Sequence, residues 1–237
     1  MRDPVVNPFP FLEQLVQPLA DVLGLRTIPL HVHEILGSAL LYQIIFAYIA
    51  PRLSAQLVPQ YYKKLPRDGA LRWNMHCVSM VQSIMISILT LWTILNDEER
   101  KAMTHEERVW GYIGAPALVQ ALAVGYFLWD LTVMVRHTSV FGLPMLAHAS
   151  SCFIVFALGY RPILNYYSCV FMLYELSTPF LNIHWFMDKV NMTGSKAQVL
   201  NGVLLISTFF SARLAYGGYM SIFLYSDVWK ALQTKRT

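Results

Sequence analysis

Six separate stretches of the chain are apolar over about the length that a helix needs to cross a lipid bilayer. They cover residues 32–50, 73–95, 115–135, 139–158, 162–182 and 199–224. Crossing the hydrocarbon core takes about 20 apolar residues in an α-helix. Backbone polar groups in lipid must also find partners inside their own segment, which favours helices over strands. The sequence therefore predicts an all-α, polytopic membrane protein with a bundle of six transmembrane helices.

The composition excludes most other classes of protein. Of the 237 residues, 56% are hydrophobic and 14% are charged, with a mean hydropathy of +0.44. A soluble domain carries roughly 45–50% apolar and about 25% charged residues, so this chain lacks the charge to coat a water-facing surface. The net charge of +4 comes from dispersed basic residues, and no basic cluster indicates nucleic-acid binding. The cysteines, Cys77, Cys152 and Cys169, lie in apolar stretches and are interpreted as packing residues.

The chain divides into three parts. Residues 1–30 form an amino-terminal segment, residues 31–225 form the transmembrane domain, and residues 226–237 form a carboxyl-terminal tail. The first part contains an amphipathic helix over Phe11–Leu23, interrupted at Pro18. Such a helix lies in the membrane interface or packs against the bundle, and the sequence leaves both alternatives open.

Two polar loops separate the first three stretches. The loop over residues 51–72 is basic, which indicates contact with anionic lipid headgroups. The loop over residues 96–110 alternates acidic and basic residues and is interpreted as a solvated connection. Within it, Thr104 and Glu107 have the spacing of a capping box, which predicts the start of a helix. Basic residues are nearly balanced between the two sides, so the orientation stays undecided.

Three ionisable residues lie deep inside the predicted spans. His148 is at the midpoint of the fourth span, Glu175 is just past the middle of the fifth, and Arg213 is near the middle of the sixth. An ionisable group at the centre of a membrane helix costs about 2.5–3.5 kcal/mol on insertion scales and usually has a function. Their similar depth on three helices predicts that they converge on a common ligand.

Further polar residues extend this predicted site toward one face of the membrane. His76 opens the second span and Asp130 closes the third, while Thr178 and Asn182 share a helical face with Glu175. Because neighbouring spans are antiparallel, these residues belong to the same half of the bilayer. The predicted lipid-binding residues are His148, Glu175, Arg213, Asp130, Thr178, Asn182 and His76.

Structural explanations compete with this site. Glu175 and Arg213 form either part of a ligand site or a buried ion pair that only holds the bundle together. Serine and threonine on the spans hydrogen-bond between helices. His148 has no histidine or carboxylate three or four residues away, so no metal site is predicted. No cofactor is expected either.

The polar motifs, taken in order, resemble the TLC-domain family of endoplasmic-reticulum proteins. They are Trp129-Asp130, His148 within residues 146–151, Glu175 within residues 174–181, and Arg213 followed by Gly217. The resemblance covers about residues 30–225 and is closest to the small TLC domain-containing subgroup. The family also includes ceramide synthases and translocon-associated proteins. The resemblance implies a six-helix bundle around an acyl-chain cavity, in a multi-pass protein of the endoplasmic-reticulum membrane.

Three functions follow as expectations from this resemblance. The first is binding of a membrane lipid or fatty acyl chain within the bundle, in sphingolipid or phospholipid homeostasis. The second is N-acyl transfer resembling that of ceramide synthases, with acyl-CoA as co-substrate, His148 as the catalytic base and Glu175 orienting it. Ala147 replaces the first of the two adjacent histidines of ceramide synthases. The third is a trafficking or translocon-accessory role, and a homodimer is left open.

Overall fold

The computed structural model describes residues 4–234, which contain helices and connecting segments but no strand. The long helical elements are α2 (Ile28–Ile44), η1 (Ile45–Ile49), α3 (Ala50–Leu57), α5 (Arg67–Asn96), α8 (Gly114–Arg136), α10 (Leu143–Leu158), α11 (Asn165–Met172), η2 (Leu173–Ser177), α12 (Thr178–Lys189), α13 (Lys196–Phe209), η3 (Phe210–Tyr216) and α14 (Gly217–Thr234). The remaining helices are α1 (Pro10–Leu23), α4 (Pro59–Tyr62), α6 (Glu98–Lys101), α7 (His105–Trp110) and α9 (Thr138–Phe141).

Four helices of the described chain are long and apolar enough to cross a membrane. They are Ile28–Leu57, Arg67–Asn96, His105–Arg136 and Lys196–Thr234. The predicted all-α, multi-pass fold is therefore confirmed, but the count of six spans is not. The fourth predicted span corresponds to α10, which has only 16 residues and is about 24 Å long at the usual helical rise. The fifth is divided by the 3₁₀ segment η2.

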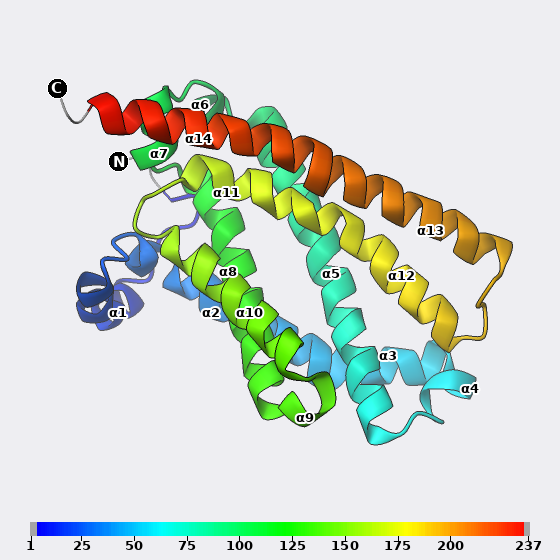
Figure 1. The fold of residues 1–237 in the computed structure, drawn as a ribbon. Coiled ribbons are helices and arrows are strands. Elements are labelled where there is room, and N and C mark those ends of the chain that lie inside the picture. The colour runs from blue at the N-terminus through cyan, green and yellow to red at the C-terminus, as the bar shows by residue number, and fades with distance from the viewer. Residues whose placement is uncertain (1–3, 235–237) are drawn as a thin grey trace.

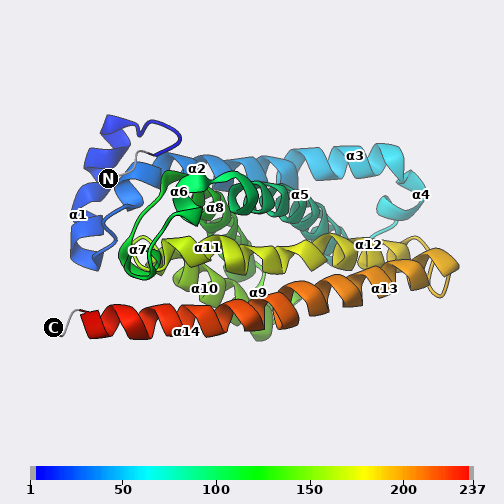
Figure 2. The same ribbon diagram turned by 90° about the horizontal axis from the view of Figure 1, so that it is seen from above.

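The helices form two groups that meet along α5. The continuous helix α13–η3–α14 runs beside α11–η2–α12, and the two views in Figures 1 and 2 agree on this arrangement. On the other side, α8 packs between α2 and α10. A buried cluster joins α2, α5 and α8 through Tyr42, Val78 and Trp129, and Ala149 of α10 adds to it. The bundle core therefore lies among α2, α5, α8 and α10.

The contact between α2 and α8 depends on small residues. Ala121 is fully buried, and a Cβ atom added to Gly125 would lie 2.6 Å from the Cβ of Ser38 on α2. Ser38 Oγ donates a hydrogen bond to the Leu122 carbonyl at 2.7 Å. Small residues four apart let two membrane helices approach closely.

Helix α1 is continuous through Pro18, so the predicted interruption is wrong. The proline removes one backbone hydrogen bond but does not end the helix. α1 contacts α2 and leaves large apolar side chains exposed, with Phe11 75% and Val22 83% accessible. α1 therefore packs on the bundle, and its exposed apolar face suits the membrane interface, where its location stays a prediction.

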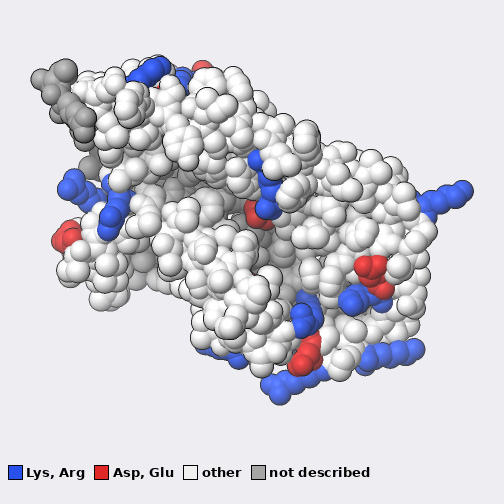
Figure 3. Space-filling view, viewed as in Figure 1, with Lys and Arg blue, Asp and Glu red and all other residues white. Residues whose placement is uncertain are grey.

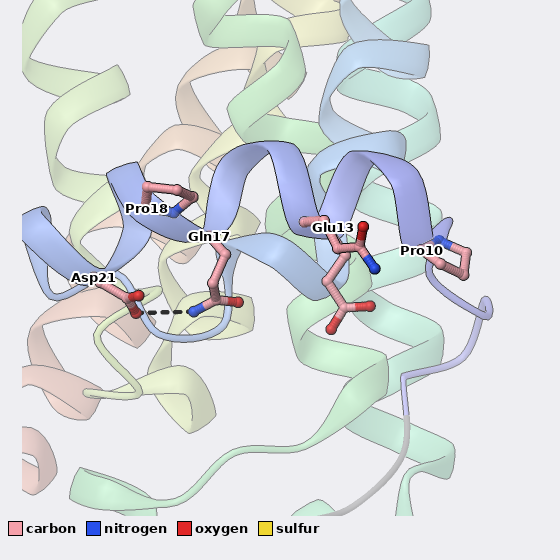
Figure 4. Close-up of a pocket in the computed structure, with 6 residues that line it drawn as sticks. Pro10, Glu13, Gln17, Pro18 and Asp21 are labelled. Carbon is pink, nitrogen blue, oxygen red and sulfur yellow. Dashed lines mark hydrogen bonds between the residues drawn. The ribbon is translucent and has the colours of Figure 1, made fainter.

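A hollow of about 630 Å³ beside α1 is shown in Figure 4. Its lining residues are Pro10, Glu13, Gln14, Gln17, Pro18 and Asp21. All of them come from α1, and Gln17 Nε2 donates to Asp21 Oδ1 at 2.8 Å. A hollow lined by one helix is the polar face of that helix, so it is not a binding cavity.

The segment from residue 96 to residue 110 is not a simple solvated loop. It folds into α6 and α7, and the predicted capping box of Thr104 and Glu107 is confirmed. Arg100 is buried over the Tyr166 ring, 3.9 Å from its centroid, and donates to the Tyr166 carbonyl. The prediction of a solvated connection is wrong here, because a charged side chain can be buried when it stacks on an aromatic ring.

The predicted tail over residues 226–237 is helical as far as Thr234, and residues 235–237 lie outside the described residues. Asp227 is only 1% exposed. It accepts hydrogen bonds from Tyr167 of α11 at 2.7 Å and from His105 of α7 at 2.5 Å. This part of α14 is therefore a packed element of the fold.

Candidate functional site

Two irregular helical segments present the charged residues at the centre of the molecule. Glu175 lies in the 3₁₀ segment η2, and Arg213 lies in the π-helical segment η3, which contacts η2. Pro179 explains part of this geometry, because it has no N–H group to bond the Glu175 carbonyl as an α-helix requires. The Thr178 N–H bonds that carbonyl instead, which tightens the helix locally. Segments of these two kinds within helices are frequently functional.

Arg213 is held at the junction of η2 and η3. Its Nε donates to the Tyr174 carbonyl at 3.1 Å. Its guanidinium carbon is 5.7 Å from the centroid of the Tyr174 ring and 5.2 Å from that of Phe209. Among residues 4–234, no ion pair joins Arg213 to Glu175. The alternative of a buried ion pair that only holds the bundle together is therefore not observed.

Two carboxyl groups lie close together beside this junction. Asp130 of α8 is 7% exposed, and its charge interacts with that of Glu175. Both charges act on the hydroxyl of Tyr126, one turn before Asp130 on α8. Within the described chain, neither carboxylate makes a hydrogen bond or ion pair. Their oxygens therefore remain available to a ligand that donates hydrogen bonds or bears positive charge.

The space-filling view shows where these charges lie on the surface. In Figure 3 an acidic and a basic group sit together in a hollow at the centre of a face that is otherwise largely uncharged. The hollow lies between the labels of α11 and α12 in the view of Figure 1, and η2 is the segment that joins these two helices. Other charged groups on this face gather near its ends.

A chain of hydrogen bonds connects α5 to α12 near the same carboxyl groups. His76 Nδ1 is 2.8 Å from Asn182 Oδ1, and Asn182 Nδ2 donates to Ser79 Oγ at 3.0 Å. With the amide assigned in this way, Nδ1 of the imidazole is the donor. Trp185 stacks on His76 with ring centroids 4.0 Å apart. Ser79 also interacts with the Tyr126 hydroxyl, which links this chain to Asp130 and Glu175.

The predicted position of His148 needs correction. It lies on the exposed side of α10, and its ring contacts Cys152, with Nε2 3.7 Å from the sulfur. No hydrogen bond or ion pair among the described residues joins it to Glu175 or Arg213. The adjacent Ala149 is the residue that packs in the core, and one residue along a helix rotates the side chain by about 100°.

The edge of α10 that includes His148 still faces the cluster. Cys152, one turn later, interacts electrostatically with Glu175, Asp130 and Arg213. The structure thus pairs His76 with Asn182, places Asp130 within electrostatic range of Glu175, and bonds Arg213 to the Tyr174 carbonyl beside Glu175. It places His148 on the exposed side of α10 and the half-buried Thr178 at the start of α12. The roles of these residues stay predictions.

Asp188 lies outside the cluster, at the turn between α12 and α13. Its carboxylate accepts hydrogen bonds from Gln198 Nε2 at 2.6 Å and from Thr193 Oγ1 at 2.9 Å. These bonds hold the pKa of Asp188 below its ordinary value. This residue stabilises the turn and is not needed for the candidate site.

The sequence analysis missed a second buried polar cluster at the start of α2. His31 is fully buried, with Nδ1 2.6 Å from Glu34 Oε2 and Nε2 2.7 Å from the Tyr112 hydroxyl. The signal was the histidine and the acid three residues apart at the edge of the first span. No group of histidine, cysteine and acidic residues in residues 4–234 has the geometry to hold a metal ion.

Comparison with known proteins identifies the family. Residues 72–237 match the TLC domain. The chain belongs to the TLC-domain family. The matched region includes every residue of the candidate site, so the site lies within the TLC domain itself. No solved structure matches the chain significantly.

Curated relatives with TLC domains cover most of the chain. An uncharacterized TLC domain-containing protein of Schizosaccharomyces pombe is 42% identical over 208 residues, which is 88% of this chain and 69% of the relative. Topoisomerase I damage affected protein 4 of Saccharomyces cerevisiae is 33% identical, over 84% of this chain and 72% of the relative. Human TLC domain-containing protein 4 is 29% identical, over 77% and 70% respectively.

Proposed function

We propose that this TLC-domain protein binds a lipid or fatty acyl chain between its helices and acts in lipid homeostasis in the endoplasmic-reticulum membrane. Support comes from its multi-pass fold and from its family. Expression of the full chain with a fluorescent tag tests the location. Overlap with an endoplasmic-reticulum marker is expected, and residence in another membrane contradicts this part of the proposal.

One observation carries the binding proposal. Asp130, Glu175 and Arg213 come from three different elements and all interact electrostatically with Cys152 of α10, yet within the described chain no ion pair neutralises any of them. Ionisable groups in a membrane protein are costly unless they serve a site or a pathway. A bound polar headgroup provides the missing partners.

The chemistry of the cluster suits the polar end of a lipid. Arg213 still has guanidinium N–H groups beyond the Nε that bonds Tyr174, and such groups form paired hydrogen bonds with a carboxylate or phosphate. Asp130 and Glu175 accept hydrogen bonds from hydroxyl or amine groups. The largely uncharged face around the hollow provides surface for the hydrocarbon part of the molecule.

The acyltransferase alternative gains no support from the geometry. It requires His148 as a base oriented by Glu175, and the two side chains share no hydrogen bond among the described residues. A base must lie within hydrogen-bond reach of its proton and be oriented by a partner. Lipid binding requires no such contact, so it is the function proposed.

Native mass spectrometry of protein purified in mild detergent tests the proposal. The wild-type chain is expected to retain an acyl lipid, and Glu175→Gln is expected to retain about tenfold less, because one charged hydrogen-bond acceptor is lost. Glu106→Gln is the matched control, since Glu106 is an exposed acid of α7 away from the site. A wild-type protein that is consistently free of lipid contradicts the proposal.

A further inference from the structure

A second cleft lies at the end of the molecule where three of the membrane helices reach the surface. Its volume is about 500 Å³. It is lined from three directions, by η1 and the start of α3, by the first two turns of α5, and by the turn between α8 and α9. None of its lining residues belongs to the candidate site.

One side of this cleft provides hydrogen-bond donors. The lining residues with donor groups are Arg67, Asn74, His137 and Ser139. Tyr62 donates to the amide oxygen of Asn74 at 3.0 Å, which leaves the Asn74 N–H groups available. Asp68 is the acidic member of the lining, and it lies on the same turn as Arg67.

The start of α5 adds further hydrogen-bond donors to the cleft. The helix begins after Pro66, and no side chain caps it. The first N–H groups of a helix have no partner within the helix, and the positive end of its dipole lies there. An anion at this end of the cleft meets the Arg67 guanidinium and the helix terminus, with the Asp68 carboxylate of the first turn as the opposing charge.

Apolar residues line the cleft beside these donors. Phe46 and Ala47 come from the π-helical segment η1, and Leu71 of α5 and Val140 of α9 add to them. A π-helical segment inside a longer helix is uncommon and frequently occurs at a functional site. An apolar surface beside a set of donors matches a phosphate group that is joined to hydrocarbon.

The cleft is held in shape by Arg72. This residue follows Arg67 by more than one turn on α5 and donates to the Val140 carbonyl. Its guanidinium carbon also lies 5.4 Å from the centroid of the Phe141 ring. These contacts fix α9 against α5, so the wall that includes Ser139 and Val140 is preorganised.

We propose that this cleft binds the phosphate headgroup of an anionic phospholipid, with the acyl chains leaving along Phe46 and Ala47. The position supports a lipid over free phosphate, because the cleft lies where Ile28–Leu57 ends its membrane passage, where Arg67–Asn96 begins and where His105–Arg136 ends. Headgroups lie at that level. The proposal does not depend on the ligand of the candidate site.

The test is native mass spectrometry of the full chain titrated with phosphatidic acid, and with diacylglycerol of the same chain length. Phosphatidic acid is expected to bind more tightly. Arg67→Gln is expected to weaken its binding about tenfold, because a charge-assisted hydrogen bond is lost. Lys63→Gln removes the same charge from an exposed residue outside the cleft and is expected to bind as the wild type does.

A second variant makes the test independent of charge. Ala47 is exposed on η1, so Ala47→Trp is expected to fold, fill the cleft and weaken binding of phosphatidic acid. Inorganic phosphate is expected not to displace the lipid. Equal binding of diacylglycerol, displacement by inorganic phosphate, or wild-type binding by both Arg67→Gln and Ala47→Trp would overturn the proposal. Glu175→Gln is expected to leave this binding unchanged, which separates the two sites.

Discussion

At the scale of single residues, Gly217 allows η3 to approach η2. A Cβ atom added there would lie 2.5 Å from the Tyr174 hydroxyl oxygen, and the carbonyl of Tyr174 is the acceptor for Arg213. We expect Gly217→Ala to displace the Tyr174 ring and destabilise the protein by about 1–3 kcal/mol, as overpacking does. Thermal unfolding of the purified protein in detergent measures this loss.

Gly218 provides the matched control. A Cβ atom at that position meets nothing within 4 Å, so Gly218→Ala has the same effect on helix propensity without the clash. Alanine in place of a helical glycine stabilises by roughly 0.5–1 kcal/mol. Equal melting temperatures for the two variants would show that Tyr174 moves aside at no cost.

The helix that carries each polar residue was predictable from the sequence, whereas the direction of a side chain around its helix was not. Glu175, Arg213 and Asp130 all interact electrostatically with Cys152 of α10. His148 was expected to point into the bundle, and it lies on the exposed side of α10. A shift of one residue in the assumed packing face rotates a side chain by about 100°, and no pattern on α10 fixed that face, since its residues are apolar nearly all round.

At the scale of helices, the pair α2 and α8 depends on close approach at Gly125. A Cβ atom there would meet the Ile35 carbonyl oxygen and lie 2.6 Å from the Ser38 Cβ. Because backbone cannot rotate aside as a side chain can, Gly125→Ala is expected to separate the helices and to cost at least as much as Gly217→Ala, about 3 kcal/mol. Gly37→Ala on α2 is the control, since its Cβ meets nothing within 4 Å.

Thermal unfolding of the purified Gly125→Ala and Gly37→Ala proteins measures the difference. An unchanged melting temperature for Gly125→Ala would mean that the contact is not as tight as the distance indicates. Ala121 and Gly125 are a small residue pair at a spacing of four, a signal of close helix packing that was present in the sequence. Pro179 was also present in the sequence as a signal, and it accounts for the 3₁₀ segment η2.

Asp227 joins α14 to α7 and α11. It receives bonds from His105 and Tyr167 and lies 3.5 Å from the Arg108 guanidinium. Asp227→Asn removes the charge and places a donor against other donors, so we expect a loss of about 1–3 kcal/mol. Hydrogen exchange in the last turns of α14 should become faster. Ser226→Ala changes the exposed neighbouring residue and is expected to leave the exchange rate of these turns unchanged. Exchange as slow as that of the wild type in both variants would contradict the role of Asp227.

At the scale of the whole molecule, the sequence predicted the class of fold correctly but not the number of long spans. Hydropathy identifies apolar stretches, and it found all four of the long helices. It does not detect where a helix ends inside such a stretch. Gly142, with φ of +85°, separates α9 from α10 and shortens the fourth stretch, and Pro179 interrupts the fifth.

The contacts at its two ends indicate that α10 nevertheless crosses the membrane. At its carboxyl end, the Tyr160 carbonyl accepts from Thr27 N–H at 3.1 Å, and Arg161 donates to the Leu23 carbonyl at 3.0 Å. Both partners lie just before α2. At its amino end, α9 is bonded to Arg72 at the start of α5. Because Ile28–Leu57 is long and apolar enough to cross a membrane between these levels, we expect α10 to join opposite sides.

Cysteine labelling in sealed microsomes tests this topology. Ser139→Cys and Arg161→Cys are expected to react with a membrane-impermeant maleimide from opposite sides, because both residues are exposed at opposite ends of α10. Asp68→Cys should be labelled from the same side as Ser139→Cys, and Asp21→Cys should be labelled from the same side as Arg161→Cys. A helix of 16 residues requires local thinning of the bilayer to span it, at a modest cost. If Ser139→Cys and Arg161→Cys were both labelled from one side, α10 would be a re-entrant helix that does not cross the membrane. The hollow shown in Figure 3 would then open toward that side.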